Sequence, residues 1–499
     1  MRTPLNVPQD VASGRRGGRV RPWRVVAAGA VVFVVGQVLA SPPATTPGAV
    51  APPSKVEPVE SVAPLPPTLE TAGPEERAAL TALLTSPAWA RQAIGCMRLE
   101  RFTCAASLAQ IRTFLHSPNW AMRCFALRSL AVRRSEPPPE WIAAEADPRV
   151  VRAILRCGFR VEPERLRIGY ERLARSQDTL DRMLAVELAA ASRDEKLRED
   201  ARDVVASVIG RMTRAECGAV SSRLALVTGA PDVGRPYRWQ DWLRKNRRSM
   251  VLRSADIFDR DESDMRSAVA RLEESRFVAL EAYMLELAPR NIDLAIVIDC
   301  TASMYGDIAQ AQSGVDDLMH FVSGVVTSLR VGIVGFRDRR DVDFETRAWD
   351  LTDDLVELRK RLWSLTADGG GDRAELVYEG LMLAYTRLSW DPQRTRMLVL
   401  IGDAPPHVGF GGMCVDAARE GARVGLTTHV IQARLGRDRD GNRTQDVEHF
   451  REIAAAGGGR CIPIKQDDSL IVEIAGLAVG ERCREEMVDF FGVYRRLCR

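Results

Sequence analysis

The sequence predicts an α/β domain with a doubly wound, mostly parallel sheet, preceded by an all-α domain of helical repeats. Two observations favour the sheet: near-continuous apolar runs at residues 292–298 and 396–401, each followed by a polar loop. Such runs are typical of strands that are buried on both faces of a parallel sheet. A third observation favours the helical domain, because residues 75–250 are rich in Ala, Leu and Arg and have helical periodicity.

The first predicted strand leads into a helix through a short polar run. Residues 299–304 read Asp-Cys-Thr-Ala-Ser-Met, and apolar residues recur at helical spacing after them, from Ile308 to Leu329. The polar run therefore occupies the turn from a buried strand into a helix. Ligands of open α/β sheets bind at this place, outside the carboxyl ends of the strands.

Two further polar loops have the same character. Residues 369–375 read Gly-Gly-Gly-Asp-Arg-Ala-Glu, and residues 402–407, after the second strand, read Gly-Asp-Ala-Pro-Pro-His. We expect all three loops to meet at one edge of the sheet and to supply carboxylate and hydroxyl oxygens. Hard cations such as Mg²⁺, Mn²⁺ and Ca²⁺ prefer these ligands, whereas Zn²⁺ and Cu²⁺ do not. Taken singly, each loop has a plainer interpretation, as a helix N-cap or a turn.

In this order the three segments resemble the von Willebrand factor type A (VWA) domain, a Rossmann-like fold, and most closely its bacterial members. The resemblance covers roughly residues 291–480 and implies a metal-ion-dependent adhesion site. Carried over residue by residue, the implied ligands are Asp299, Thr301, Ser303, Asp372 and Asp403. The implied ion is Mg²⁺, with Mn²⁺ or Ca²⁺ as alternatives.

The chain departs from the family pattern in three places. Ala302 replaces the usual glycine, Arg373 and Ala374 replace the x-Pro before Glu375, and Asp372 stands where many relatives have a ligating threonine. The additional carboxylate is expected to tighten metal binding. It is also expected to weaken the attraction of the ion for an acidic partner.

An internal repeat is visible in the helical part. Residues 86–89 (Ser-Pro-Ala-Trp), 117–120 (Ser-Pro-Asn-Trp) and 147–150 (Asp-Pro-Arg-Val) recur about every thirty residues, with apolar residues at matching offsets after each. A Ser or Asp before Pro is a typical helix start. The pattern resembles HEAT-like repeats, which would stack as a solenoid with a concave binding surface. The alternative is an irregular helical bundle.

The N-terminus predicts export from the cytoplasm. Residues 1–24 carry six arginines and one acidic residue, and residues 25–40 carry no charge. Residues 25–41 are therefore either a retained transmembrane anchor or a signal peptide cleaved after Ala40. The arginines hold the N-terminus in the cytoplasm. We expect a bacterial protein in the cell membrane, with a single span and its bulk in the periplasm, or a secreted protein if the segment is cleaved.

The remaining boundaries follow from changes in composition. In chain order, the expected segments are a cytoplasmic basic N-terminus (1–24), the anchor or signal (25–41), a Pro-rich linker (42–75), HEAT-like repeats (76–250), a helical connector (251–290), the VWA domain (291–480) and a helical tail (481–499). Residues 337–341 are predicted to form a solvated loop. Residues 470–499 are expected to pack back on the sheet.

Charge and cysteine content exclude some classes of function. A formal net charge of +3 on 499 residues argues against a nucleic-acid partner. The ten cysteines form no Cys-x-x-Cys pair, which argues against a zinc site. In an exported compartment, Cys414, Cys461, Cys483 and Cys498 are candidates for disulfides, and their pairing stays open.

The predicted function is protein binding, and no catalytic residue is assigned. A metal held by five protein groups keeps one position for an exposed Asp or Glu of a partner protein. The alternative is a metal-dependent hydrolase or phosphoryl-transfer enzyme, because Asp-x-Asp-x-Thr phosphatases also place aspartates at a strand end. Here Thr301 occupies the slot of their second aspartate. His407 is interpreted as a loop or packing residue, and Cys300 has no nearby His or Lys that would activate it.

Overall fold

The computed structural model describes residues 73–102, 104–191, 194–231, 234–253, 274–339, 341, 343–370, 374–433, 447–464 and 470–498. The predicted basic N-terminus and membrane segment lie outside these ranges, as does nearly all of the linker. Asp372 also lies outside them. Within the described ranges, no helix combines the length and apolar character needed to cross a bilayer.

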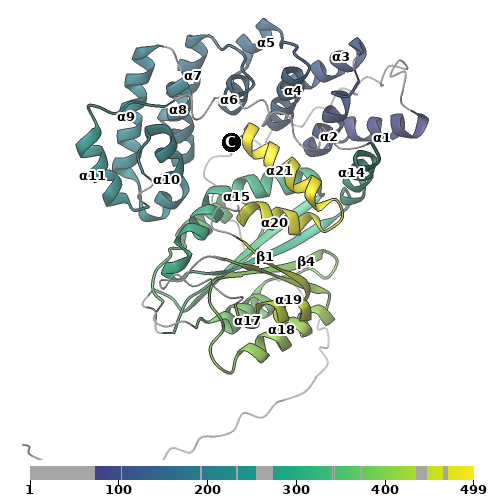
Figure 1. Cartoon of the computed structure of the whole chain (residues 1–499), viewed down its shortest axis with the longest axis vertical. Helices are drawn as coiled ribbons and strands as arrows, with labels where there is room; N and C mark the ends of the chain where they lie inside the picture. Colours follow the sequence, from purple (N-terminus) through teal and green to yellow (C-terminus); the bar gives the residue numbers. More distant parts are fainter. Residues whose placement is uncertain are drawn as a thin grey trace, which may run out of the picture. The chain divides into compact units, whose positions relative to one another are not determined.

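A mixed sheet forms the centre of the sheet domain, by which we mean residues 291–479 (Figure 1). The strand order is β3-β2-β1-β4-β5-β6, and all neighbours are parallel except β3, which runs antiparallel to β2 at one edge. The strands are β1 (Asn291–Asp299), β2 (Ser328–Phe336), β3 (Thr346–Thr352), β4 (Thr395–Gly402), β5 (Leu426–Gln432) and β6 (Gly458–Pro463). This arrangement confirms the doubly wound, mostly parallel sheet.

Helices cover both faces of this sheet, which explains why β1 is apolar along nearly its whole length. Ile296 and Ile298 belong to the core on one face, while Ala295 and Val297 belong to the core on the other. The first face is covered by α15 (Tyr305–Val325), α16 (Leu355–Ser364) and α20 (Leu470–Val479). The second is covered by α17 (Val377–Arg387), α18 (Gly411–Arg423) and α19 (Phe450–Ala456).

The helical region, residues 74–246, precedes the sheet domain. Its elements are α1 (Pro74–Leu84), α2 (Trp89–Leu99), α3 (Ala105–Thr113), the 3₁₀ turn η1 (Phe114–His116), α4 (Trp120–Val132), α5 (Pro139–Ala144), α6 (Pro148–Arg156), α7 (Pro163–Ala174), α8 (Thr179–Ala191), α9 (Glu195–Arg211), α10 (Arg214–Thr228) and α11 (Pro236–Asn246). The predicted repeat marks helix starts, since α2, α4 and α6 each begin within it. Asn119 and Asp147 cap α4 and α6 through their side chains. Membership of the HEAT class stays a prediction.

The helical region and the sheet domain share one hydrophobic core. It contains Trp89 and Phe125 from the helical region together with Phe321 and Phe490 from beyond it. The last described helix, α21 (Arg484–Cys498), packs against α4, α6 and α15. α21 also packs against α20, and its Phe490 and Tyr494 contact Phe321 of α15. The tail therefore packs on helices that cover one face of the sheet, and the helical region covers its other side.

Four planar groups stack in a column across this junction. The ring of His320, on α15, lies between those of Trp89 and Trp120, 4.9 Å from each centroid, and the Arg149 guanidinium lies 4.2 Å from the Trp120 ring. Burial, with a smaller contribution from Arg149, lowers the pKa of His320 to about 4, and its Nδ1 is 3.0 Å from the Tyr494 hydroxyl. The repeated motif thus supplies three of the four stacked groups.

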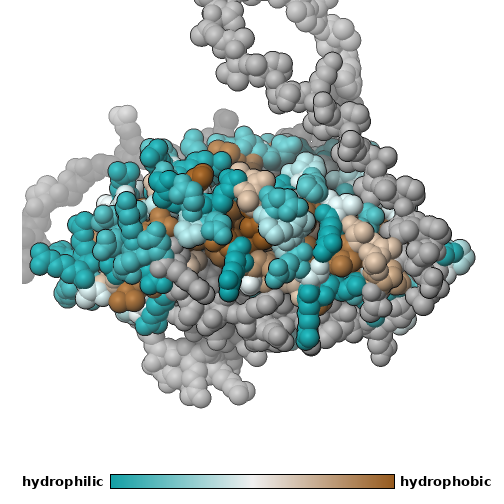
Figure 2. Space-filling model, turned by 90° about the horizontal axis from the view of Figure 1, so that it is seen from above, coloured by the Kyte–Doolittle hydropathy of each residue, from teal (hydrophilic) through white to brown (hydrophobic). Residues whose placement is uncertain are grey.

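This junction corrects the expectation of an open concave binding surface. In Figure 1 the helical region forms an arc over α15, α20 and α21, and α2, α4 and α6 contact α15 or α21. The inner faces of these three helices are therefore covered by the chain itself. Figure 2 views the molecule from above, where the coloured surface is largely hydrophilic with small hydrophobic areas. All ten cysteines are described residues, and no two of them form a disulfide.

Candidate metal site at the carboxyl edge of the sheet

Asp299, the last residue of β1, is the centre of the predicted site. Its Oδ1 accepts hydrogen bonds from the backbone N–H and the hydroxyl of Thr301, both at 2.8 Å. The residue is fully buried, and its Oδ2 has no hydrogen-bond partner among the described residues. A buried carboxylate oxygen without a donor is unfavourable unless a proton or a cation accompanies it.

Ser303 and Asp403 complete a connected group with these two residues. Ser303 lies in the 3₁₀ turn η3 (Ala302–Met304), and Asp403 directly follows β4. The Ser303 hydroxyl donates to Asp403 Oδ1 at 3.0 Å and lies 3.3 Å from the Thr301 hydroxyl. Because β1 and β4 are neighbouring parallel strands, their carboxyl ends meet at the same edge. The structure therefore brings together four of the five predicted ligands.

The loop that leads to Asp372 runs along the first loop. The backbone N–H of Asp368 donates to the carbonyl of Cys300 at 3.1 Å. Gly370 has a φ of +85°, and a Cβ there would lie 3.3 Å from Cβ of Thr301. The glycine is needed because the two loops approach each other this closely.

Sequence reasoning missed two carboxylates beside this group, Glu375 and Asp338. Glu375 is 4% exposed, and its Oε2 has no hydrogen-bond partner within the described ranges. Burial, followed by the charges of Asp299, Asp338 and Asp403, raises the pKa of Glu375 to about 9. A signal was available, because Glu375 closes the glycine-rich segment and Asp338 lies just beyond β2, the other neighbour of β1.

The predicted solvated loop at residues 337–341 is wrong for its first two residues. Arg337 is 2% exposed and donates to the Thr366 carbonyl at 2.6 Å. Asp338 is also buried, with His407 Nε2 3.3 Å from its Oδ1. The loop is held inward because its charges find partners in neighbouring segments.

The electrostatics of the group suit a hard cation. Burial, and then the charge of Asp403, raises the pKa of Asp299 to about 7. Within the described ranges, no three His, Cys, Asp or Glu side chains converge tightly enough to hold an ion unaided. A cation would therefore depend on the hydroxyls of Thr301 and Ser303 as well as on the carboxylates. That donor set fits Mg²⁺ or Ca²⁺.

Residues 293–466 match the von Willebrand factor A domain family. This segment is a VWA domain. A curated relative, the alpha-protein kinase vwkA of Dictyostelium discoideum, is 28% identical over 122 residues, which is 24% of this chain and 19% of the kinase. The chain thus spans about a fifth of the length of that relative.

One solved structure that the chain matches is the conserved hypothetical protein BatB of Bacteroides thetaiotaomicron. The match is 20% identical with a TM-score of 0.30, and it covers 37% of this chain and 96% of BatB. Another is the pilus adhesin SpaC of Lactobacillus rhamnosus GG, which is 13% identical with a TM-score of 0.32 and covers 38% of this chain and 30% of SpaC.

The helical region borders the candidate site of the VWA domain. Arg214, the first residue of α10, lies 2.9 Å from Asp368 and donates to the Ala367 carbonyl at 3.2 Å. After α10, Gly234 approaches Tyr305, such that a Cβ on the glycine would lie 3.1 Å from the tyrosine ring. Tyr305 begins α15, two residues after Ser303. Residues of the helical region therefore contact segments on both sides of the predicted ligands.

Proposed function

We propose that the VWA domain binds one divalent cation and presents it to an acidic side chain of a partner protein. The observation that carries this proposal is the buried Asp299 carboxylate, with one unpartnered oxygen, hydrogen-bonded into a group with Thr301, Ser303 and Asp403. Asp372 would be the fifth ligand. Mg²⁺ is the preferred ion, with Mn²⁺ or Ca²⁺ as alternatives, and the bound cation would supply the positive charge that attracts an Asp or Glu.

The residues around the ion would have distinct tasks. The backbone N–H and hydroxyl of Thr301 orient Asp299 by holding its Oδ1. Ser303 links the Thr301 hydroxyl to Asp403 across the edge of the sheet. Glu375 keeps its proton at neutral pH in the absence of a cation, because its pKa is raised to about 9. This limits the negative charge that gathers at the site.

We also propose that the site binds and does not catalyse. Cys300 is fully buried, and burial raises the pKa of its thiol well above the usual range, which disfavours a nucleophilic role. The Thr301 hydroxyl is engaged by Asp299. The alternative, a metal-dependent hydrolase or phosphoryl-transfer enzyme, would need an acid–base group in the position that Thr301 occupies.

Thermal unfolding with and without Mg²⁺ tests the cation. The ion should raise the Tm of the wild-type chain relative to chelator, and the rise should be absent in Asp299→Ala. Asp416→Ala is a matched control, because Asp416 is exposed on α18 and pairs with Arg419. Equal Tm values of the wild type with saturating Mg²⁺ and with chelator would contradict the proposal.

Capture experiments test the partner. A membrane extract passed over the immobilised wild-type chain should yield a bound protein that chelator releases. Asp299→Ala should fail to retain that protein, and Asp416→Ala should retain it. If the chain instead hydrolyses phosphate esters or peptides with Mg²⁺, and Asp299→Ala abolishes this activity, the enzyme alternative replaces the binding proposal.

We further propose that residues 25–41 place the bulk of the chain outside the cytoplasm, as a single-pass membrane protein or, after cleavage, as a secreted one. The flanking arginines and the uncharged run support this. Protease added to spheroplasts should digest residues 76–499 while cytoplasmic markers survive. Protection of both would contradict export. N-terminal sequencing of the mature protein distinguishes an anchor from cleavage after Ala40.

A further inference from the structure

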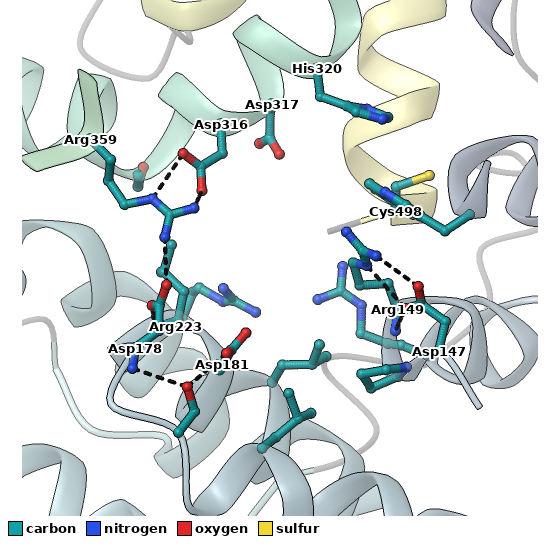
Figure 3. Close-up of a pocket in the computed structure, with 18 of the residues that line it drawn as sticks. Asp147, Arg149, Asp178, Asp181, Arg223, Asp316, Asp317, His320, Arg359 and Cys498 are labelled. Atoms are coloured by element: carbon teal, nitrogen blue, oxygen red, sulfur yellow. Dashed lines mark hydrogen bonds and ion pairs between the residues drawn. The ribbon is translucent and has the colours of Figure 1, made fainter. Parts of the chain in front are cut away.

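A pocket of about 570 Å³ lies between the helical region and the VWA domain, away from the candidate metal site. Its walls come from α4, α6, α7, α8 and α10 on one side and from α15, α16 and α21 on the other. Figure 3 shows charged side chains from both sides around a central space. The volume lies in the range of sites for small organic ligands.

The acidic side chains that line the pocket already have partners. Arg149 donates to both carboxylate oxygens of Asp147, at 3.0 and 2.7 Å (Figure 3). Arg359 pairs with Asp316 of α15 and with Asp178 of the helical region, and so joins the two parts of the chain. The remaining two acidic residues are also engaged, since Asp317 pairs with Arg495 and Asp181 accepts from the Ser176 hydroxyl.

Two arginines that line the pocket, Arg152 and Arg223, are different, because they share one carboxylate. Arg152 Nη1 donates to one oxygen of Glu187 at 2.9 Å, and Arg223 Nε donates to the other at 2.9 Å. Arg156 adds its charge to this group. Although burial alone would raise the pKa of Glu187, the three arginines lower it to about 2. The cluster therefore holds more positive than negative charge in a buried place.

Arg152 also has unused hydrogen-bond donors. Its side chain is 3% exposed, and its Nε and Nη2 have no hydrogen-bond partner in the part of the chain that the structure describes. These two nitrogens form one side of the guanidinium group, which can donate two parallel hydrogen bonds to the two oxygens of a carboxylate or phosphate. Burial, and then the charges of Arg156 and Arg223, lowers the pKa of Arg152 to about 9. A bound anion would accept hydrogen bonds from these two nitrogens of Arg152. It would also reduce the repulsion between Arg152 and the charges of Arg156 and Arg223.

We propose that this pocket binds a small organic anion, whose single phosphate or carboxylate group contacts Arg152 and Arg223. The aspartates that line the same pocket disfavour a second anionic group on the ligand. They favour hydroxyl or amino groups on the rest of it, because these donate to carboxylates. The inference does not depend on a metal at the edge of the sheet.

Thermal unfolding of the full chain with inorganic phosphate, acetate or chloride at equal ionic strength tests the pocket, with chelator present throughout to silence the metal site. Phosphate or acetate should raise the Tm in a saturable way, and chloride should not. The stronger of the two identifies the preferred oxyanion. If neither gives a saturable rise beyond that of chloride, the proposal is wrong.

Three variants test whether the oxyanion binds at Arg152. Arg152→Met should weaken the binding of the oxyanion by about tenfold or more, because it removes a buried two-point donor. Arg149→Gln, at the more exposed rim, should weaken it only a few-fold. Arg419→Met is the matched control, since it removes the same charge from an exposed position on α18, and it should bind as the wild type does. Equal binding by Arg152→Met and Arg419→Met would overturn the assignment.

If Arg152→Met does not fold, Glu187→Gln tests whether the oxyanion binds in this pocket. This change leaves Arg152 and Arg223 without the negative charge that they share, so phosphate should stabilise the variant more than it stabilises the wild type. A stabilisation equal to or smaller than that of the wild type would show that the anion binds elsewhere, and the proposal would fall.

Discussion

At the scale of single residues, the raised pKa of Asp299 leads us to predict an unusual dependence of stability on pH. Its pKa is about 7 in the folded chain without a cation, against about 4 in an unfolded chain. The folded state therefore holds this proton more tightly. Its stabilising contribution is fully present below about pH 4 and is lost as the pH rises to about 7. The free energy of unfolding in chelator should fall across this window.

The variant Asp299→Asn isolates the contribution of Asp299 to the pH dependence of stability. Such a variant is needed because the lowered pKa of His320 changes stability with pH in the opposite direction. In chelator at alkaline pH, Asp299→Asn should be more stable than the wild type by about 1–3 kcal/mol. The difference should shrink at acidic pH and should reverse with saturating Mg²⁺ if the cation binds. Urea unfolding over a pH series measures it. A difference that does not change with pH would contradict the raised pKa.

The sequence identified only part of the residue-level site. Asp299, Thr301, Ser303 and Asp403 were predictable because they follow the strands whose apolar runs define the sheet. Glu375 was not, because its raised pKa depends on burial and on carboxylates from separate loops. No spacing pattern reveals such a meeting of distant segments.

At the scale of elements, α15 packs so tightly against the helical region that one added methyl group is expected to destabilise the chain. A Cβ on Gly324 would lie 2.6 Å from Cε2 of Trp89, within the stacked column. Gly324→Ala should therefore destabilise the chain by about 1–3 kcal/mol. Gly306→Ala in the same helix is the control, because its Cβ would meet nothing within 4 Å. Urea unfolding of both variants compares them, and equal stabilities would contradict the packing argument.

Because α10 contacts the metal-site loop, we predict a modest energetic coupling between this contact and the binding of Mg²⁺. Arg214 pairs with Asp368, and both side chains are about half exposed. Exposed ion pairs contribute at most about 1 kcal/mol. Arg214→Gln should therefore lower the affinity for Mg²⁺ by no more than about fivefold, measured by calorimetric titration, without changing the Tm in chelator by more than a few degrees. A complete loss of binding would assign Arg214 a larger role.

Strands β1 and β4 were predictable because burial on both faces leaves an apolar run. The placement of α21 was not. Its periodicity predicted an amphipathic helix, but the sequence does not say which surface receives the apolar face. Residues of α4 and α6, more than 300 positions earlier, receive part of it, and α15 and α20 receive the rest.

At the scale of the whole molecule, the shared core predicts that the VWA domain does not fold well by itself. Phe321, Phe490 and Tyr494 are buried in the whole chain and contact Trp89 or Phe125 of the helical region, so removal of residues 74–253 would expose them. The truncated chain should be poorly soluble or should bind a hydrophobic dye strongly. Size-exclusion chromatography and dye fluorescence compare it with the full chain. A monomeric, dye-free VWA fragment would contradict the shared core.

The position of α21 also has a consequence for biosynthesis. A ribosome releases α2, α4 and α6 hundreds of residues before it makes residues 484–498, which cover the inner faces of α4 and α6. During that interval, the aromatic residues of the helical region lack their final contacts, and exposed apolar surface of this kind is what chaperones bind. Completion of the core must therefore await the synthesis of residues 484–498, and a chain truncated before residue 484 would leave the apolar faces of α4 and α6 without this cover.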